Sequence, residues 1–419
     1  MKLPKVALVE QRFDPQRIED IPAEVAKEMA GLRLEEKVRP GDAVAVTAGS
    51  RGIANIDVVT RAVVDELKRL GARPFIFPAM GSHGGATAEG QAGVLEKYGI
   101  TESSMGCPIR SSMEVEYLGD AGDGYPIHVD RNAMAADHIV VVNRVKPHTK
   151  FEGPLESGLM KMMAIGMGKQ RGAEYYHRAA VRLTFPRIVE TVGREVIRRC
   201  PILFGLGVVE NGYEQTCLIR ALPPEEIPEG ERALLAAAKE RMARLPFDEI
   251  DVLVVDLMGK DISGTGMDTN VTGRNRDIIG DFTAGPRVKR IFVRGLTDGS
   301  DGNAVGIGFA DFTTARLVDK IDRGKTYVNC LTGISPEKGA IPMYFDADRE
   351  ALEACLATIG DIPVDDVRLV HIRSTLHLSR LSCSRAFEEE IEGLPSLRLL
   401  SGWEEMALGE DGNIVSPFE

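Results

Sequence analysis

The segment AVAVTAGSRGIANIDVVTRAVVDELKRLGARPFIFP, residues 43–78, alternates between two kinds of apolar pattern. Short apolar runs at residues 43–46 and 74–77 have the composition of buried strands. Between them, apolar residues recur at the spacing of one helical face, which predicts a helix over residues 56–70. A strand, a helix and a second strand in this order predict a parallel βαβ unit.

The same alternation continues along the chain. A further helix is predicted over residues 231–245, which are rich in Ala and Arg. Strand-like runs occupy residues 138–142, 203–209, 252–256, 289–293 and 367–371. The sequence therefore predicts the α/β class, with mostly parallel sheets.

The length of 419 residues favours two domains, because it exceeds what one hydrophobic core usually organises. A charged helix gives way at Pro246 to a new apolar strand, so we place the boundary near residue 247. The expected domains are residues 1–247 and 248–419, both α/β, with the last segment a candidate to pack back on the first domain. A cleft between them is the expected location of the active site.

Composition limits the classes of function. Hydrophobic residues make up 43% and charged residues 27% of the chain, as in ordinary globular proteins. The net charge of -12 argues against a nucleic-acid or anionic-membrane partner. The six cysteines form no C-x-x-C pair, and no apolar stretch is long enough to span a membrane. A cytoplasmic protein is expected.

Two glycine-rich loops follow predicted strands and carry reactive side chains. Arg51 lies in the loop after residues 43–46, where backbone N–H groups and a guanidinium could bind an anion. His83, between glycines in the loop after residues 74–77, is suited to acid–base chemistry. A surface arginine in a tight turn and a polar loop of helix caps are the structural alternatives.

A third and a fourth segment add further candidates. His148 lies in the charged, Pro- and Gly-rich loop 143–158, which could equally be a solvated surface loop. Lys161 stands among methionines, where a lysine either reaches to solvent or has a lowered pKa. His177 follows, with no nearby set of conventional metal ligands. We interpret the methionines as core filling.

In this order, the four segments resemble the lactate racemase superfamily, whose members use a nickel pincer nucleotide. The motifs that carry the resemblance are Arg51, Gly81-Ser82-His83, Pro147-His148, Lys161 and His177, the last two separated by 16 positions. The resemblance implies that Lys161 can link covalently to the cofactor and that His177 is the one protein ligand of nickel. The pincer itself then supplies the other donors.

The same resemblance implies the reaction. His83 and His148 would be an acid–base pair on opposite faces of a 2-hydroxy acid, which loses hydride to the pincer and regains it on either face. Arg51 and Lys260 would bind the substrate carboxylate. The implied function is a racemase or epimerase.

Departures from the family pattern concern the substrate. Ala48 stands where lactate racemase has an aspartate, and His148 and Lys161 are thirteen residues apart instead of ten. Trp403, the only tryptophan, is too late in the chain to match the family tryptophan. A sugar acid such as an aldonate is therefore a better expectation than lactate. Further candidates for substrate contacts are Arg274, as an alternative to Lys260, and Asn270, Asp311 and His377.

Three alternatives remain open from the sequence. One is a pincer-dependent enzyme that transfers hydride without racemisation, and another is a nickel-nucleotide binding protein. The third is an α/β protein whose glycine loops and histidines have other roles. The expected partners are a small 2-hydroxy acid and the cofactor-synthesis proteins that deliver the pincer, with no nucleic acid and no membrane.

Overall fold

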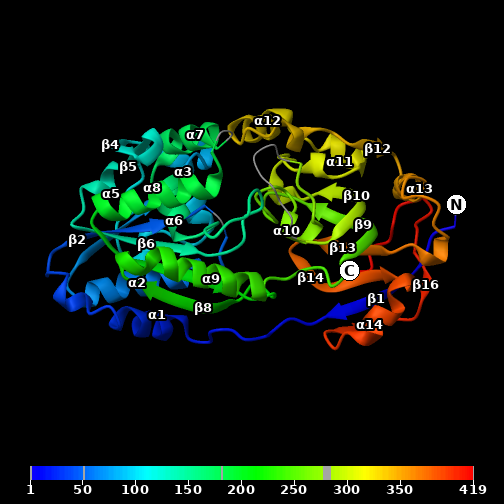
Figure 1. The fold of residues 1–419 in the computed structure, drawn as a ribbon, viewed down its shortest axis with the longest axis horizontal. Helices are drawn as coiled ribbons and strands as arrows, with labels where there is room; N and C mark the ends of the chain where they lie inside the picture. The colour runs from blue at the N-terminus through cyan, green and yellow to red at the C-terminus, as the bar shows by residue number, and fades with distance from the viewer. Residues whose placement is uncertain (1, 51, 181–182, 277–284, 419) are drawn as a thin grey trace. The chain divides into compact units, whose positions relative to one another are not determined.

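The computed structural model describes residues 2–50, 52–180, 183–276 and 285–418, without the side chains of residues 123 and 177. The described chain is mixed α/β, which confirms the predicted class (Figure 1). It forms two compact units. The N-terminal unit is Pro15–Met242, and the C-terminal unit combines Ala243–Glu419 with Met1–Asp14.

The N-terminal unit contains a five-stranded sheet in the order β3-β2-β6-β7-β8. Its first four strands are parallel, and β8 is antiparallel to β7. The strands predicted in this half of the chain are confirmed, each extended by a few residues. Their bounds are β2 (Ala43–Ala48), β3 (Arg73–Pro78), β6 (His138–Arg144), β7 (Ile202–Glu210) and β8 (Thr216–Leu222).

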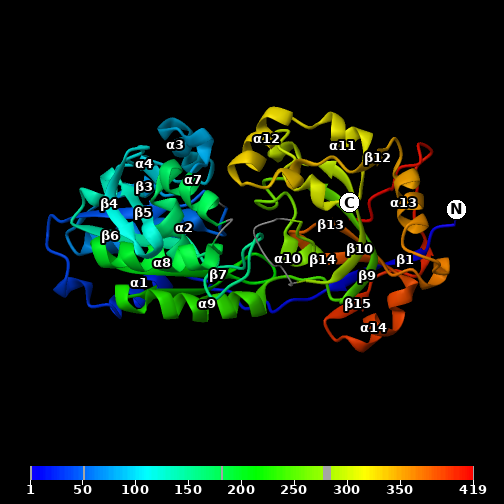
Figure 2. The ribbon, with the colours of Figure 1, turned by 45° about the horizontal axis from the view of Figure 1, so that its top comes forward.

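Helices cover both faces of this sheet. On one face, α1 (Ile21–Ala30) and α2 (Ile56–Arg69) share a core with alternate residues of β2, β6 and β7. On the other face, Gly205 and Gly207 of β7 lie against α6 (Leu159–Lys161) and α9 (Ile227–Arg241). A Cβ at Gly205 would lie 2.8 Å from Leu159, and one at Gly207 would lie 2.5 Å from Leu234. Figure 2 shows these layers from a second direction.

Shorter elements complete the N-terminal unit. A separate hairpin consists of β4 (Val115–Ala121) and β5 (Tyr125–Asp130). The predicted helix 231–245 is displaced to Ile227–Arg241, because Pro228 fits the first helical turn and Met242 already has extended backbone. The remaining helices are α3 (Ala88–Lys97), α4 (Glu102–Met105), α5 (Arg131–Met134), α7 (Lys169–Ala179) and α8 (Phe185–Arg199).

The C-terminal unit is built on a mixed sheet in the order β12-β11-β10-β9-β13-β14-β1-β15, with β16 also paired to β1. The strands from β12 to β13 are parallel, and the others are antiparallel. Bounds are β1 (Lys5–Gln11), β9 (Glu249–Met258), β10 (Arg287–Leu296), β11 (Phe312–Thr314), β12 (Met343–Phe345), β13 (Leu369–Ser374), β14 (His377–Ser384), β15 (Leu397–Leu399) and β16 (Glu404–Glu405).

The position of β1 differs from the domain assignment made from the sequence, which gave residues 1–14 to the first domain. β1 pairs antiparallel with β14, Val6 lying opposite Ser384, and so completes the sheet of the C-terminal unit. Alternate residues of β1 are buried, as expected for a strand with one covered face. The local pattern predicts such a strand, but it cannot name a partner more than 370 residues away.

The faces of the second sheet also have separate cores. Alternate residues of β9 point to two different clusters, Leu253 and Val255 to one and Val252 and Val254 to the other. Helix α13 (Asp348–Ala357) packs on the second cluster. The other helices of the unit are α10 (Thr269–Thr272), α11 (Ala315–Asp319), α12 (Arg323–Thr332) and α14 (Glu388–Gly393).

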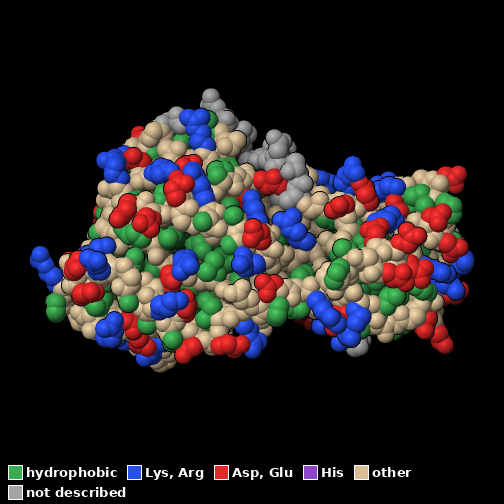
Figure 3. Space-filling view, turned by 60° about the horizontal axis from the view of Figure 1, so that its bottom comes forward, with side chains coloured by type: hydrophobic (Ala, Val, Ile, Leu, Met, Phe, Trp, Pro, Cys, Tyr) green, Lys and Arg blue, Asp and Glu red, His purple; other side chains and the backbone are tan. Residues whose placement is uncertain are grey.

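The surface is mixed in charge. On the face drawn in Figure 3, acidic and basic side chains are interspersed. No helix in the described part of the chain is both long enough and apolar enough to cross a membrane.

Candidate active site in the N-terminal unit

Three loops leave the carboxyl ends of neighbouring parallel strands in the N-terminal unit. They are residues 49–55 after β2, residues 79–87 after β3 and residues 145–158 after β6. Since parallel strands end at the same edge of a sheet, these loops gather at one place, which is where α/β proteins bind ligands. The loops contain Arg51, His83 and His148.

His83 precedes a single 3-10 turn, Gly84–Ala86, and its side chain is exposed. Its Nδ1 forms a hydrogen bond with the side chain of Ser50 in the loop after β2. Gly84 has a φ of +66°, and a Cβ there would lie 2.6 Å from the backbone of Gly90. The glycine next to His83 is therefore required by the close approach of α3 to this loop.

His148 is held by its own loop. Its Nδ1 accepts a hydrogen bond of 3.0 Å from the backbone N–H of Lys150, and its ring stacks on Phe151 at 4.2 Å. Its backbone N–H donates to the buried carboxylate of Glu156 at 2.6 Å, and Glu156 pairs with Lys239 of α9. Because Nδ1 acts as an acceptor, a neutral ring at this position carries its proton on Nε2.

Lys161 ends α6 and is half-buried. The chain then continues as a π-helical segment, Met162–Gly166, an irregularity that is frequent at functional sites. Met160, Met162 and Met163 are all at most 5% exposed, as expected for core filling. The lysine therefore emerges from a rigid, closely packed turn.

The π-helical segment contacts the loop of His83. The backbone N–H of Gly81 donates to the carbonyl of Gly166 at 3.2 Å. A Cβ on Gly166 would lie 2.5 Å from the carbonyl oxygen of Ala79, so only glycine permits this approach. The structure thereby brings the segment that follows Lys161 against the loop that carries His83.

Glu231, which the sequence analysis missed, fixes the start of α6. Its carboxylate accepts a hydrogen bond of 2.7 Å from the backbone N–H of Met160. Burial raises the pKa of Glu231 to about 7, although the backbone hydrogen bonds act in the opposite direction. Glu231 lies four residues after Ile227 and three before Leu234, so it is on the apolar face of α9. A charged residue within an apolar helix face was the sequence signal that could have identified it.

Two predicted residues cannot be placed in full. Arg51 lies outside the described residues, and His177 belongs to α7 but its side chain lies outside the description. Near Arg51, Glu210 of β7 accepts a hydrogen bond of 2.7 Å from the backbone N–H of Ala54 and forms an ion pair with Arg144. This pair anchors the far end of the Arg51 loop.

Lys260 belongs to the C-terminal unit and follows β9. Its Nζ donates to the carbonyl of Gly264 at 2.8 Å. Arg274, the alternative candidate, forms an ion pair with Asp311 and donates to the carbonyl of Val288 at 2.7 Å. Arg274 therefore stabilises the C-terminal unit through its contacts with a backbone carbonyl and a carboxylate of that unit.

The other candidates of this unit also have local contacts. Asn270 is 2% exposed and donates to Asp268 at 2.9 Å, and His377 contacts Ser374 through Nδ1 at 2.8 Å. Trp403 donates from Nε1 to Glu388 at 2.9 Å. None of these contacts links the candidates into a single group.

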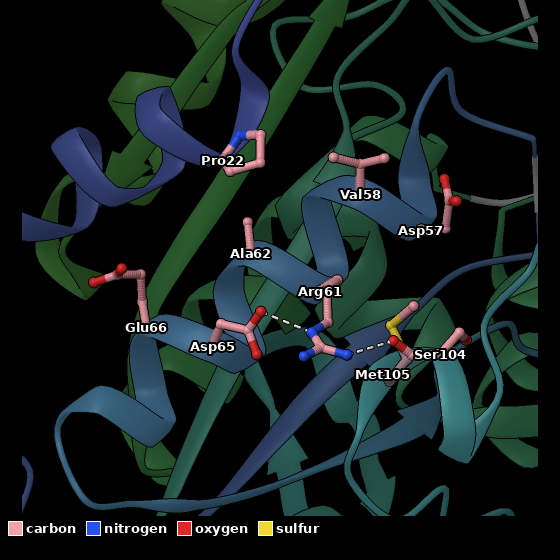
Figure 4. Close-up of a pocket in the computed structure, with 9 residues that line it drawn as sticks. All are labelled: Pro22, Asp57, Val58, Arg61, Ala62, Asp65, Glu66, Ser104 and Met105. Atoms are coloured by element: carbon pink, nitrogen blue, oxygen red, sulfur yellow. Dashed lines mark hydrogen bonds and ion pairs between the residues drawn. The ribbon is translucent and has the colours of Figure 1, made fainter.

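A cavity of about 310 Å³ lies elsewhere in the N-terminal unit (Figure 4). It is lined by residues of α1, α2 and α4, and Arg61 crosses it to reach Asp65 and the carbonyl of Ser104, both at 2.7 Å. None of the predicted site residues lines this cavity. Among the described residues, no three His, Cys, Asp or Glu side chains lie close enough together to hold a metal.

Residues 6–184 match the family described as the lactate racemase N-terminal domain. That range contains Arg51, His83, His148, Lys161 and His177. The lactate racemase apoprotein from Thermoanaerobacterium thermosaccharolyticum has a similar structure, with a TM-score of 0.55 and 12% identity, over 86% of this chain and 93% of that chain. At this identity the likeness shows the fold. A search of curated proteins found no match.

The family match and the shared fold confirm the resemblance seen in the sequence. Residues 6–184 are assigned to the lactate racemase N-terminal domain family, and the chain shares the fold of the lactate racemase apoprotein. This assignment supports an isomerase of the racemase type that acts on a 2-hydroxy acid.

Proposed function

We propose that this protein racemises or epimerises a 2-hydroxy acid other than lactate, by reversible hydride transfer to a nickel pincer nucleotide. The observation that carries the proposal is the contact between Gly81 and Gly166, because it joins the His83 loop to the segment that begins at Lys161. The loop that carries the acid–base group is then in contact with the segment that follows the amine for cofactor attachment.

The two histidines are suited to different first steps. His148 carries its proton on Nε2 when neutral, so it can donate a hydrogen bond to the substrate oxygen, and it would act as an acid from its doubly protonated form. His83 forms a hydrogen bond with Ser50 through Nδ1, and we assign proton exchange with the substrate to its Nε2. One histidine takes the hydroxyl proton of one enantiomer, and the other returns a proton after the keto acid has turned.

Lys161 and His177 would hold the cofactor. Lys161 ends α6 and His177 belongs to α7, and only the π-helical segment and a turn at residues 167–168 separate these two helices in the chain. The donor set fits a pincer, because a single imidazole completes a site whose other ligands the cofactor brings. When bound, the pincer would supply the carbon that accepts and returns hydride.

The substrate carboxylate would be bound by Arg51 with two parallel hydrogen bonds and by Lys260 as a point charge. We further propose a cytoplasmic location and delivery of the pincer by its cofactor-synthesis proteins.

The test is to produce the protein together with the cofactor-making enzymes, then to measure nickel, intact mass and turnover of a panel of 2-hydroxy acids. We expect nickel, added mass or a bound nucleotide, and interconversion of stereoisomers with no electron acceptor. Turnover that requires an acceptor would favour a non-racemising enzyme, and bound pincer without turnover would favour a binding protein. Absence of both nickel and nucleotide would refute the proposal.

A further inference from the structure

Lys169, the first residue of α7, has an unusual environment. Its side chain is fully buried, and its φ of +53° lies in the left-handed region that favours glycine. A long charged side chain is stable at such a position only if the surrounding structure holds it there. The contacts of Nζ show how Lys169 is held.

Three oxygen atoms surround the Nζ of Lys169. It forms an ion pair with Asp130 at 3.0 Å, and it donates to the carbonyl of Pro78 at 2.5 Å and to Oε1 of Gln91 at 3.1 Å. Asp130 is also fully buried. Burial lowers the pKa of Lys169, whereas the ion pair with Asp130 raises it. The three oxygen atoms around Nζ stabilise the charged ammonium form.

Gln91 extends this network into the loop of His83. Its side chain is fully buried, and its Nε2 donates to the carbonyls of Gly81 at 2.9 Å and of His83 at 3.2 Å. Pro78 is the last residue of β3, so Lys169 holds the start of this loop directly and its end through Gln91. Both ends of residues 79–83 are therefore attached to one ammonium group.

We propose that Lys169 is a positioning residue that fixes the His83 loop relative to the segment that carries Lys161. Lys161 and Lys169 lie eight residues apart in the chain, on either side of the π-helical segment, so the network couples the attachment point of the cofactor to the acid–base histidine. The inference rests on the proposed function for the role of His83. The attachment of the loop itself can be measured on the protein without cofactor.

The experiment compares two variants by hydrogen–deuterium exchange and by kinetics of the loaded enzyme. Gln91→Met removes the link to the loop and keeps the ion pair. Lys169→Met combined with Asp130→Asn removes both buried charges together. We expect roughly tenfold faster exchange within residues 79–87 in both variants. In the loaded enzyme, kcat should fall by roughly tenfold to hundredfold with KM nearly unchanged.

Glu28→Gln is the matched control, because it breaks a carboxylate contact with Arg220 and with the backbone N–H of Ala221 in the same unit. Its exchange in residues 79–87 and its kcat should equal those of the wild type. Unchanged exchange in Gln91→Met, or faster exchange with unchanged kcat, would overturn the proposal. If the double variant unfolds, the result for Gln91→Met alone decides whether the proposal stands. If the wild type turns over no acid, the exchange measurement still decides whether the network holds the loop.

Discussion

Glu231 of α9 accepts a hydrogen bond of 2.7 Å from the backbone N–H of Met160, the residue before Lys161. Gly158 makes room for it, since a Cβ there would lie 2.2 Å from the carboxylate. A carboxyl group buried at the start of a short helix thus fixes the backbone from which Lys161 projects. Its titration should be visible in the stability of the protein.

The first prediction concerns pH. The pKa of Glu231 is about 7 in the folded protein, above its usual 4.5. The unfolded chain therefore loses this proton first as pH rises, so stability falls between about pH 4.5 and 7 and then levels off. The loss is on the order of 3 kcal/mol. Urea unfolding at pH 5 and 8 should show it in the wild type, and a much smaller difference in Glu231→Gln. Equal pH dependence in both proteins would contradict the assignment.

The second prediction concerns the contact between the π-helical segment and the His83 loop. Gly166→Ala places a Cβ 2.5 Å from the carbonyl oxygen of Ala79, so the two segments must separate. We expect a loss of roughly 1–3 kcal/mol in stability and a lower kcat/KM. Thermal unfolding and racemisation kinetics measure these effects.

The control for that substitution is Gly93→Ala in α3, where a Cβ meets nothing within 4 Å. Because alanine favours helix more than glycine, this variant should be unchanged or more stable by about 0.5–1 kcal/mol. A loss of stability in Gly93→Ala equal to that in Gly166→Ala would show that the close contact is not the cause.

The third prediction separates acid–base histidines from structural ones. Replacing His83 or His148 with Gln in the loaded enzyme should lower kcat by roughly 10²-fold or more, because general acid–base catalysis contributes that much. His138 stands at the opposite end of β6 from the His148 loop and contacts Asp42 at 3.2 Å. His138→Gln should keep its kcat. Full activity in both His83→Gln and His148→Gln would refute their roles.

The fourth prediction concerns the C-terminal unit. Asp256 of β9 forms an ion pair with Arg294 and accepts a hydrogen bond of 2.6 Å from His371. Burial alone would raise its pKa, but the hydrogen bond from His371 and the charge of Arg294 lower it to about 2. This contribution to stability is present above pH 4 and disappears as pH falls toward 2. It amounts to roughly 2 kcal/mol.

Asp256→Asn removes one of the two carboxylates paired with the buried Arg294, and Asp348 remains at 2.8 Å, so the substitution should cost roughly 2–3 kcal/mol at pH 7. Differential scanning calorimetry measures the shift of the transition. Asp298→Asn, which removes the partner of Lys320 at a position 98% exposed, should stay within about 1 kcal/mol of the wild type. A similar shift in both variants would mean that burial of the Asp256 pair does not matter.

The strands around the candidate site were predictable because local pattern determines them. The strands β2, β3, β6, β7 and β9 contain apolar runs, and glycine loops follow β2 and β3. Lys169 and Glu231 were not found, because a lysine and a glutamate look like surface residues until the fold places them in the interior. Their partners, Asp130 and Met160, are far away in the sequence or are backbone groups, which no pattern of side chains reveals.

The pairing of β1 with β14 has a consequence for synthesis. The ribosome releases β1 first, yet its neighbours β14 and β15 are made only after residue 376. The N-terminal unit, residues 15–242, can fold while β1 has no strand to pair with. The alternating apolar strand β1 must therefore stay without its sheet partners until residues 377–399 have been synthesised.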